Sequence, residues 1–207
     1  MKKLLVLLGS VAIIQQANAQ SFQRGSLVIS ANCGIDANHL VQQQVNKYTN
    51  KTIDTTGGAA STNFNIGAEY GVTNWLGLGL QFKLDHYLHD TNVTSATGFE
   101  IGIIANLHII RAQHFNLVAG IDLGYSNLVI NLTTDNYQIY GSGSWGDLHI
   151  TPRLYFGRFG VNLNLYFPFI NYPSLSTNVA EYNEYIDNSW KSSGFGLTAG
   201  IQYRIIK

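Results

Sequence analysis

Apolar and polar residues alternate one by one along the last part of the chain. Between positions 195 and 205 the odd-numbered residues are Phe, Leu, Ala, Ile, Tyr and Ile, whereas the even-numbered ones are Gly, Thr, Gly, Gln and Arg. Because successive side chains of a β-strand point to opposite faces, this segment predicts a strand with one apolar and one polar face. Such a strand can separate hydrocarbon from a polar interior.

The same period of two recurs in seven segments upstream. In residues 76–85, for example, Leu, Leu, Leu, Phe and Leu alternate with Gly, Gly, Gln, Lys and Asp. The sequence therefore predicts an all-β fold: a closed eight-stranded antiparallel up-and-down transmembrane β-barrel. The predicted strands are residues 26–36, 61–71, 75–87, 97–110, 115–126, 144–156, 160–169 and 194–206.

The predicted connections alternate between short and long. Short turns join strands at residues 72–74, 111–114 and 157–159, whereas the long loops are residues 37–60, 88–96, 127–143 and 170–193. With an even number of strands, both termini lie at the short-turn end. Bacterial outer-membrane barrels have this arrangement, with short periplasmic turns and longer extracellular loops.

Alternation alone does not say which face points outward, since a periplasmic lipocalin-like barrel would place its apolar face inside, around a lipid. Two features favour the membrane barrel. The polar face is rich in Gly, Asn and Thr and poor in Lys, whereas a soluble surface carries roughly 25–35% charged residues. Aromatic residues also recur at both ends of the apolar face, as in interfacial girdles. The predicted girdle residues are Tyr70, Trp75, Phe115, Phe159 and Tyr203 at the short-turn end, and Phe64, Phe99, Tyr125, Trp145, Phe169 and Phe195 at the loop end.

The first residues have the features of a secretory signal peptide. Lys2 and Lys3 precede an apolar run that is shorter than the ~20 residues of a transmembrane helix. Ala17 and Ala19 then form a small-x-small cleavage pattern. We expect residues 1–19 to be removed, which leaves residues 20–207 as one barrel domain.

Composition supports a membrane-embedded protein without helical spans. Charged residues make up 12% of the chain, about half of the ~25% that is typical of soluble domains. Loss of Lys2 and Lys3 would leave ten basic and twelve acidic residues, a balance that predicts no nucleic-acid partner. Cys33 is the only cysteine, so no internal disulfide can form. The sequence contains no phosphate loop and no Cys/His spacing typical of a metal site, and we expect no cofactor.

The chain resembles the small eight-stranded outer-membrane barrels of Gram-negative bacteria, the OmpA and OmpX type. The most specific element is the last strand, where Thr198, Gly200, Tyr203 and Ile205 resemble the signal that the barrel-assembly machinery reads. Many members end on an aromatic residue, whereas this chain continues through Ile206 and Lys207. The resemblance implies a location in the outer membrane, contact with its lipids, and insertion by the assembly machinery.

The polar faces carry charged residues that the barrel would enclose. Unpaired charges are costly in a narrow interior, so we expect a network of paired acids and bases that plugs the barrel. The alternative is a narrow, porin-like channel in which Arg153, Arg204, Glu69 and Glu100 form a switchable constriction. The predicted lumen network consists of Glu69, Lys83, Asp85, Glu100, His108, Asp122, His149, Arg153 and Arg204, and Asp36 lies on the same face.

Function is predicted less specifically than fold. We expect a non-enzymatic protein with a structural or surface-interaction role, because the loop 170–193 combines aromatic and acidic residues that suit an extracellular protein or glycan partner. Its aromatic residues are Tyr172, Tyr182, Tyr185 and Trp190. The enzymatic alternative, an acyltransferase or protease, would rest on His86, His89 and Ser95.

Two prolines lie within or beside predicted strands. Pro152 falls in the middle of one, where a missing N–H predicts a bulge or local distortion. Pro168 is expected where the seventh strand meets its loop.

Overall fold

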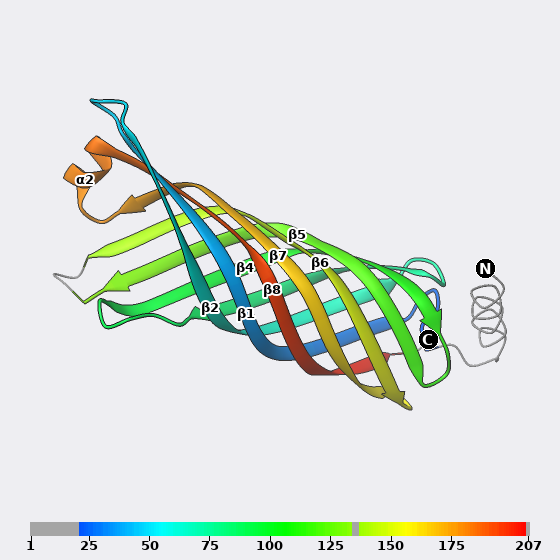
Figure 1. Ribbon diagram of the computed structural model, residues 1–207. Helices are drawn as coiled ribbons and strands as arrows, with labels where there is room; N and C mark the ends of the chain where they lie inside the picture. The colour runs from blue at the N-terminus through cyan, green and yellow to red at the C-terminus, as the bar shows by residue number, and fades with distance from the viewer. Residues whose placement is uncertain (1–20, 134–136, 206–207) are drawn as a thin grey trace, which may run out of the picture.

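The computed structural model describes residues 21–133 and 137–205 (Figure 1). The predicted signal peptide, with Ala17 and Ala19, lies outside the described residues. Eight strands form a closed barrel in which each strand pairs antiparallel with its sequence neighbours and β1 pairs with β8. They are β1 (Leu27–Asn46), β2 (Thr52–Gly71), β3 (Leu76–Tyr87), β4 (Val93–Arg111), β5 (Phe115–Leu132), β6 (Gln138–Phe156), β7 (Phe159–Thr177) and β8 (Ile186–Ile205). The predicted fold class is confirmed.

The apolar face of the strands points outward. Leu80, Ile103 and Leu163 are 64%, 59% and 42% exposed, whereas the charged side chains of the opposite face are buried. A lipid-binding barrel of reversed facing is therefore excluded, because its apolar face would line its interior. None of the described helices is long and apolar enough to cross a membrane.

Most strands are longer than the alternating pattern predicts, and the predicted long loops are correspondingly too long, whereas β3 ends at Tyr87 as predicted. The pairing of β1 with β2 continues from Ala37↔Ala60 to Val45↔Thr52, so only residues 47–51 connect them. β5 and β6 likewise extend through most of the predicted loop 127–143. The last connection is the short helix α2 (Ala180–Tyr185) with its flanks.

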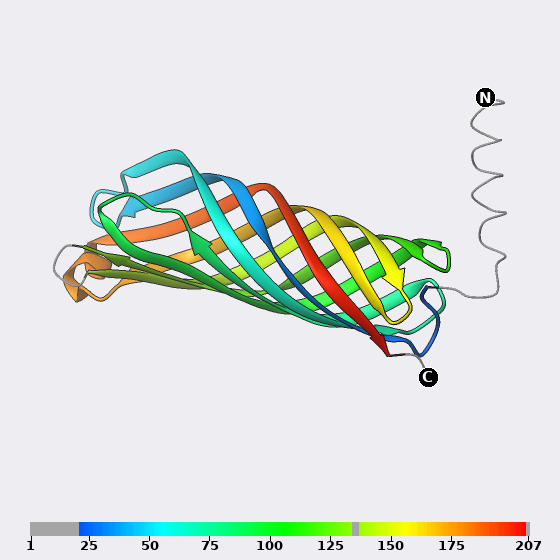
Figure 2. The ribbon, with the colours of Figure 1, turned by 90° about the horizontal axis from the view of Figure 1, so that it is seen from below.

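Strand length explains this difference. A strand of 20 residues is roughly 65 Å long, or about 50 Å along the barrel axis at a typical tilt of ~40°, twice the ~25 Å apolar band of such proteins. The outer parts of the strands therefore lie beyond hydrocarbon, where the outer face is solvated and need not be apolar. Figure 2 shows α2 at the end of the barrel opposite to the C-terminal end of β8.

A local interruption of pairing occurs at Pro152 as predicted, but the bulge lies near a different proline. Pro152 pairs with Leu117 of β5, and the β6–β7 register is the same on either side of residues 151 and 152, where pairs are missing. Pro152 therefore interrupts one ladder without forming a bulge. Pro168 lies inside β7, opposite Asp147, rather than at its end. The β7–β8 register shifts between Tyr172 and Leu175, a segment that contains Pro173. A bulge accommodates a residue that cannot donate to the ladder.

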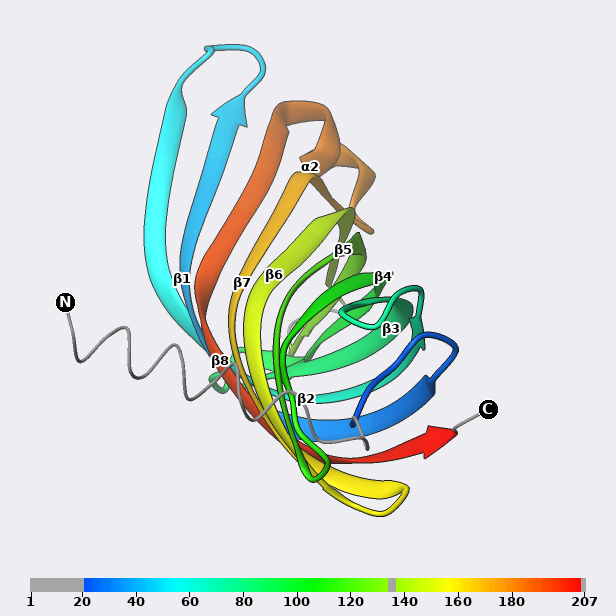
Figure 3. The same cartoon turned by 90° about the vertical axis from the view of Figure 1, so that its right-hand side faces the viewer.

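At the α2 end of the barrel, part of β2 lacks a partner strand on one side. β3 ends at Tyr87, which pairs with Ser61 of β2, so the edge formed by residues 52–60 of β2 has no partner strand on that side. Figure 3 shows the β1–β2 hairpin standing apart from β3 and β4 at this end. We call residues 52–60 the free edge of β2.

Candidate functional site

Ionisable side chains fill the middle of the barrel. The structure places all nine residues of the predicted lumen network in its interior and buries them, with exposed fractions from 0 to 8%. Asp36 and Asp147 join them on the same inner faces. These residues form three clusters, and Arg204 lies apart from all three.

The Lys83 cluster joins β1, β3 and β4. The Nζ atom of Lys83 lies 3.0 Å from Oδ2 of Asp36, 3.2 Å from Oδ2 of Asp85 and 3.5 Å from Oε2 of Glu100. Asn63 donates to Oδ1 of Asp36 at 3.0 Å, and the hydroxyl of Tyr166 donates to the same oxygen. Buried charges need such partners, because their desolvation is not repaid by one weak contact.

The Glu69 cluster lies nearer the short-turn end. Arg153 donates from Nη1 to Oε2 of Glu69 at 2.7 Å, and Nε2 of His108 lies 2.6 Å from Oε1 of the same carboxylate. The ring of Phe22 stacks on the His108 ring with centroids 3.4 Å apart. Phe22 is fully buried, so the segment before β1 closes the interior at the short-turn end.

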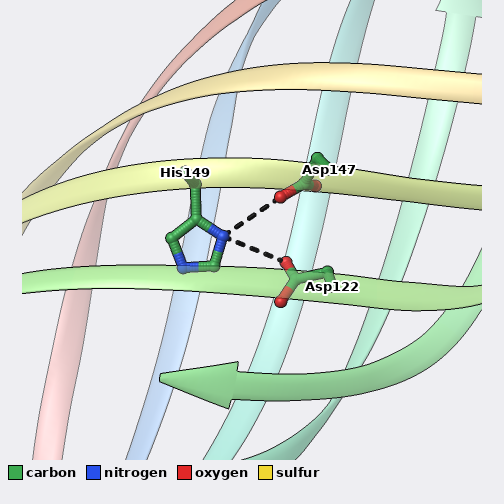
Figure 4. Close-up of side chains that lie close together, drawn as sticks. All are labelled: Asp122, Asp147 and His149. Atoms are coloured by element: carbon green, nitrogen blue, oxygen red, sulfur yellow. Dashed lines mark hydrogen bonds and ion pairs between the residues drawn. The ribbon is translucent and has the colours of Figure 1, made fainter. Parts of the chain in front are cut away.

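The third cluster comprises Asp122 of β5 with Asp147 and His149 of β6 (Figure 4). The Nδ1 atom of His149 lies 3.0 Å from Oδ1 of Asp147 and 3.6 Å from Oδ2 of Asp122. Sequence reasoning missed Asp147, although it shares the parity of His149 and Arg153 along β6. That parity was the available signal.

Together the clusters leave little open space in this part of the interior. A cavity of about 40 Å³ is lined by side chains that include Glu69, Asp122, His149 and Arg153, and it has room for a few water molecules at most. The predicted constriction of Arg153, Arg204, Glu69 and Glu100 is not assembled. Glu69 contacts Arg153, but Glu100 contacts Lys83. Arg204 donates to the backbone carbonyls of Ser21 and Gly157.

Between the charged clusters and the α2 end of the barrel, the interior becomes apolar. The buried side chains of this part, which we call the apolar vestibule, are Tyr87, Ala96, Leu128, Trp145, Ile170, Tyr172 and Leu175. Trp190 and Ile130 pack against them. A cavity of about 200 Å³ opens here between the strands.

The cavity of the vestibule reaches the free edge of β2. Its lining includes Thr55 and Gly57 from that edge, together with Leu40, Leu175 and Trp190. An apolar cavity inside the barrel thus borders the one stretch of the described wall where β2 lacks a partner strand toward β3.

Trp145 corrects one prediction. It was assigned to the lipid-facing girdle, but it is 2% exposed and lies in the vestibule. Its position has the parity of Asp147 and His149, so it points inward; its aromatic character was misleading. Phe115 and Tyr203 are half-buried on the outer face. The other outward aromatic residues are exposed: Phe64, Tyr70, Trp75, Phe99, Tyr125, Phe159, Phe169 and Phe195.

The residues of the predicted assembly signal take both faces of β8. Thr198 is fully buried inside the barrel, and Ile205 is exposed outside. Gly200 faces Asn32 of β1, where a β-carbon would lie 2.0 Å from the Asn32 side-chain oxygen. Gly200 therefore allows β1 and β8 to meet.

The predicted loop residues divide into two groups. Tyr172 and Trp190 belong to strands and line the vestibule, whereas Tyr185 lies at the outer end, with its ring centroid 5.1 Å from that of Tyr48. Ser95 accepts a hydrogen bond from Asn131 at 2.7 Å. His89 contacts the carbonyl of Asp90, so Ser95 and His89 are engaged with different partners.

Comparisons with known proteins identify the fold but no family. No family model matches the chain, and no curated protein matches its sequence. Among solved structures, the outer membrane protein OprG from Pseudomonas aeruginosa is similar with a TM-score of 0.66 and 9% identity, over 92% of this chain and 100% of OprG. Neisserial surface protein A (NspA) has a TM-score of 0.53 and 13% identity, over 87% of this chain and 99% of NspA. The outer membrane protein AlkL, solved in lipid bilayers, has a TM-score of 0.50 and 10% identity, over 92% of this chain and 95% of AlkL. The chain thus has the fold of outer-membrane β-barrel proteins.

Proposed function

We propose that this barrel takes up small apolar molecules at its outer end and releases them sideways, past the free edge of β2, to the outer surface of the membrane. The observation that carries the proposal is the apolar vestibule, whose cavity of about 200 Å³ borders the free edge of β2. A small apolar molecule gains free energy when it leaves water for such a lining, by about 25 cal/mol per Å² of buried apolar surface.

The charged clusters support a sideways route over an axial one. A molecule in the vestibule meets Lys83, Asp85 and Glu100 below it, all nearly completely buried. An apolar ligand would have to displace paired charges to continue along the axis, which is costly. Release between the free edge of β2 and β4 requires no such displacement.

The test places a large side chain from β4 in the vestibule. Ala96 of β4 lies in the vestibule and is 6% exposed, whereas Ala105 of the same strand lies on the outer face. Gram-negative cells that express the protein should take up the apolar dye N-phenylnaphthylamine faster than cells without it. We expect Ala96→Trp to reduce this gain at least threefold and Ala105→Trp to preserve it.

Heat-modifiable migration on detergent gels would show that both variants fold and reach equal levels. Equal uptake by cells with and without the protein would reject the proposed function.

A surface-interaction role is the second candidate, favoured by the tip of the β1–β2 hairpin. Tyr48 is 68% exposed and packs against Tyr185, and Lys47 forms an ion pair with Asp187 at 3.0 Å. Rigid aromatic groups on an ordered tip suit contact with an extracellular protein or glycan. Adhesion of expressing cells to glycan- and protein-coated surfaces should fall for Tyr48→Ser, with exposed Tyr140→Ser as the control.

We propose no enzymatic role. The separate partners of Ser95 and His89 support this, because a nucleophile and its base need mutual contact.

A further inference from the structure

We propose that Asp122, Asp147 and His149 bind one divalent transition-metal cation inside the barrel. This inference does not depend on the proposed uptake function, and the sequence predicts no metal site. Asp122 and Asp147 lie directly opposite each other in the β5–β6 ladder, and one ligand atom from each of the three residues lies within 4.8 Å of the others. Like charges placed opposite each other in a sheet repel.

The orientation of His149 supports metal binding. Its Nε2 atom lies 2.9 Å from the side-chain oxygen of Asn106. An amide oxygen only accepts hydrogen bonds, so Nε2 carries the hydrogen and Nδ1 faces the two carboxylates (Figure 4). Histidines that bind metals are commonly held in this way by a partner at the other ring nitrogen.

The charges around the cluster leave its acids without a fixed cation. Six buried carboxylates in the described part of the chain face three fixed cations, Lys83, Arg153 and Arg204. Lys83 and Arg153 contact carboxylates of the other two clusters, and Arg204 donates to backbone carbonyls. A proton on His149 would balance one of the two carboxylates, whereas a divalent cation balances both.

Asp122 supplies a second, independent indication. The side chain is 2% exposed, and within residues 21–133 and 137–205 its Oδ1 atom has no hydrogen-bond partner. Buried carboxylate oxygens are rarely left in this state, and an ion is one of the groups that satisfies them. The cavity of about 40 Å³ borders Asp122 and His149 and can hold water that completes the coordination shell.

The distances fit a small cation. Two ligands bound to zinc at about 2.0–2.1 Å are roughly 3.3 Å apart in a tetrahedral site, and the observed separations of Nδ1 from the two carboxylates are 3.0 and 3.6 Å. One imidazole with two carboxylates suits Zn²⁺ and related first-row ions, whereas Ca²⁺ and Mg²⁺ prefer oxygen ligands alone. The ion would cross-link β5 and β6 in the middle of the barrel.

The test loads the ion during folding, because the site is enclosed. The chain without residues 1–19 is refolded from urea into detergent, after chelator treatment, with and without an excess of Zn²⁺. After free metal is removed, zinc is measured by mass spectrometry and folding by heat-modifiable migration. We expect about one zinc per wild-type chain, and at least tenfold less for Asp147→Asn and for His149→Gln.

A matched control neutralises a buried carboxylate elsewhere. Asp85→Asn changes an acid of the Lys83 cluster and should retain zinc like the wild type. The proposal is overturned if folded wild-type protein retains no more zinc than His149→Gln. It is also overturned if nitrogen NMR of zinc-refolded protein shows both ring nitrogens of His149 protonated, since Nδ1 then binds a proton and no metal.

Discussion

Lys83 has its charged group within 3.5 Å of carboxylate oxygens from Asp36, Asp85 and Glu100, and its side chain is 3% exposed. Three acids around one base form a cluster that is far from electrically neutral when all are ionised. The stabilising contribution of such a cluster depends on every member, because removal of one partner leaves others charged and buried.

Replacement of Lys83 should therefore be more destructive than most single substitutions. We expect Lys83→Met to lower the free energy of unfolding by about 3–5 kcal/mol, the usual cost of breaking a buried ion pair from one side. Urea unfolding in lipid vesicles, followed by tryptophan fluorescence, measures this. Lys191→Met, on the exposed face of β8, serves as the control and should change stability by less than about 0.5 kcal/mol. Equal stability of the two variants would contradict the role of the cluster.

Residue parity made much of this interior predictable, because each charged residue of the lumen lies on the polar face of an alternating strand. The partners were not predictable. Whether Glu100 meets Lys83 or Arg153 depends on register and side-chain length, which the pattern does not contain. Trp145 was assigned to the outer face because its residue type was weighed above its position in β6, and Asp147 was overlooked although its position indicated the inner face.

At the scale of strands, crowding by side chains of neighbouring strands decides that some positions must be glycine. Gly196 of β8 pairs with Asp36 across the β1–β8 seam. A β-carbon at Gly196 would lie 2.1 Å from Cζ of Tyr166 and 2.4 Å from Oδ1 of Asp36. The Tyr166 ring is held there by hydrogen bonds to Asp36 and Asn63, so it cannot move aside freely.

Gly196→Ala should destabilise the barrel by about 1–3 kcal/mol, the range for overpacking. Gly57→Ala is the matched control, since nothing lies within 4 Å of the added carbon and the residue is exposed. The two variants can be compared by the temperature at which the folded gel band is lost. If both variants lose the folded band at a similar temperature, the contact between β1 and β8 accommodates the added carbon and the prediction is wrong.

Strands were predicted only where one face meets lipid. Between 61 and 71, alternation identified β2 to its end, because hydrocarbon requires an apolar outer face. Between 52 and 60 the same strand is polar on both faces, so its continuation depends on backbone pairing with β1. The vestibule and the free edge of β2 therefore could not be seen in the sequence.

At the scale of the whole molecule, the barrel is a wall around a filled interior. The three charged clusters occupy its middle, Phe22 and Arg204 lie at the short-turn end, and the vestibule lies above. Eight strands enclose just enough space for side chains. This packing predicts that the described part of the interior does not conduct ions along the axis.

We expect the purified barrel to show no ion conductance in planar lipid bilayers at moderate voltage. The combined variant Glu69→Ala, His108→Ala and Arg153→Ala removes one cluster beside the 40 Å³ cavity and should raise the frequency of small current steps. Ser192→Ala removes a single hydroxyl group from β8 outside this cluster and should leave the frequency unchanged, so it serves as the control. Regular, long-lived current steps from the wild type would favour the narrow-channel alternative.

The seam between β1 and β8 also sets when this protein can fold. Leu27 pairs with Ile205, so the ring is completed by strands that lie near opposite ends of the described chain. Contacts of such large sequence separation slow folding. Until the final residues arrive, both terminal strands expose hydrogen-bonding edges that invite aggregation. Export and insertion must therefore keep seven strands apart from other chains while the eighth is still absent.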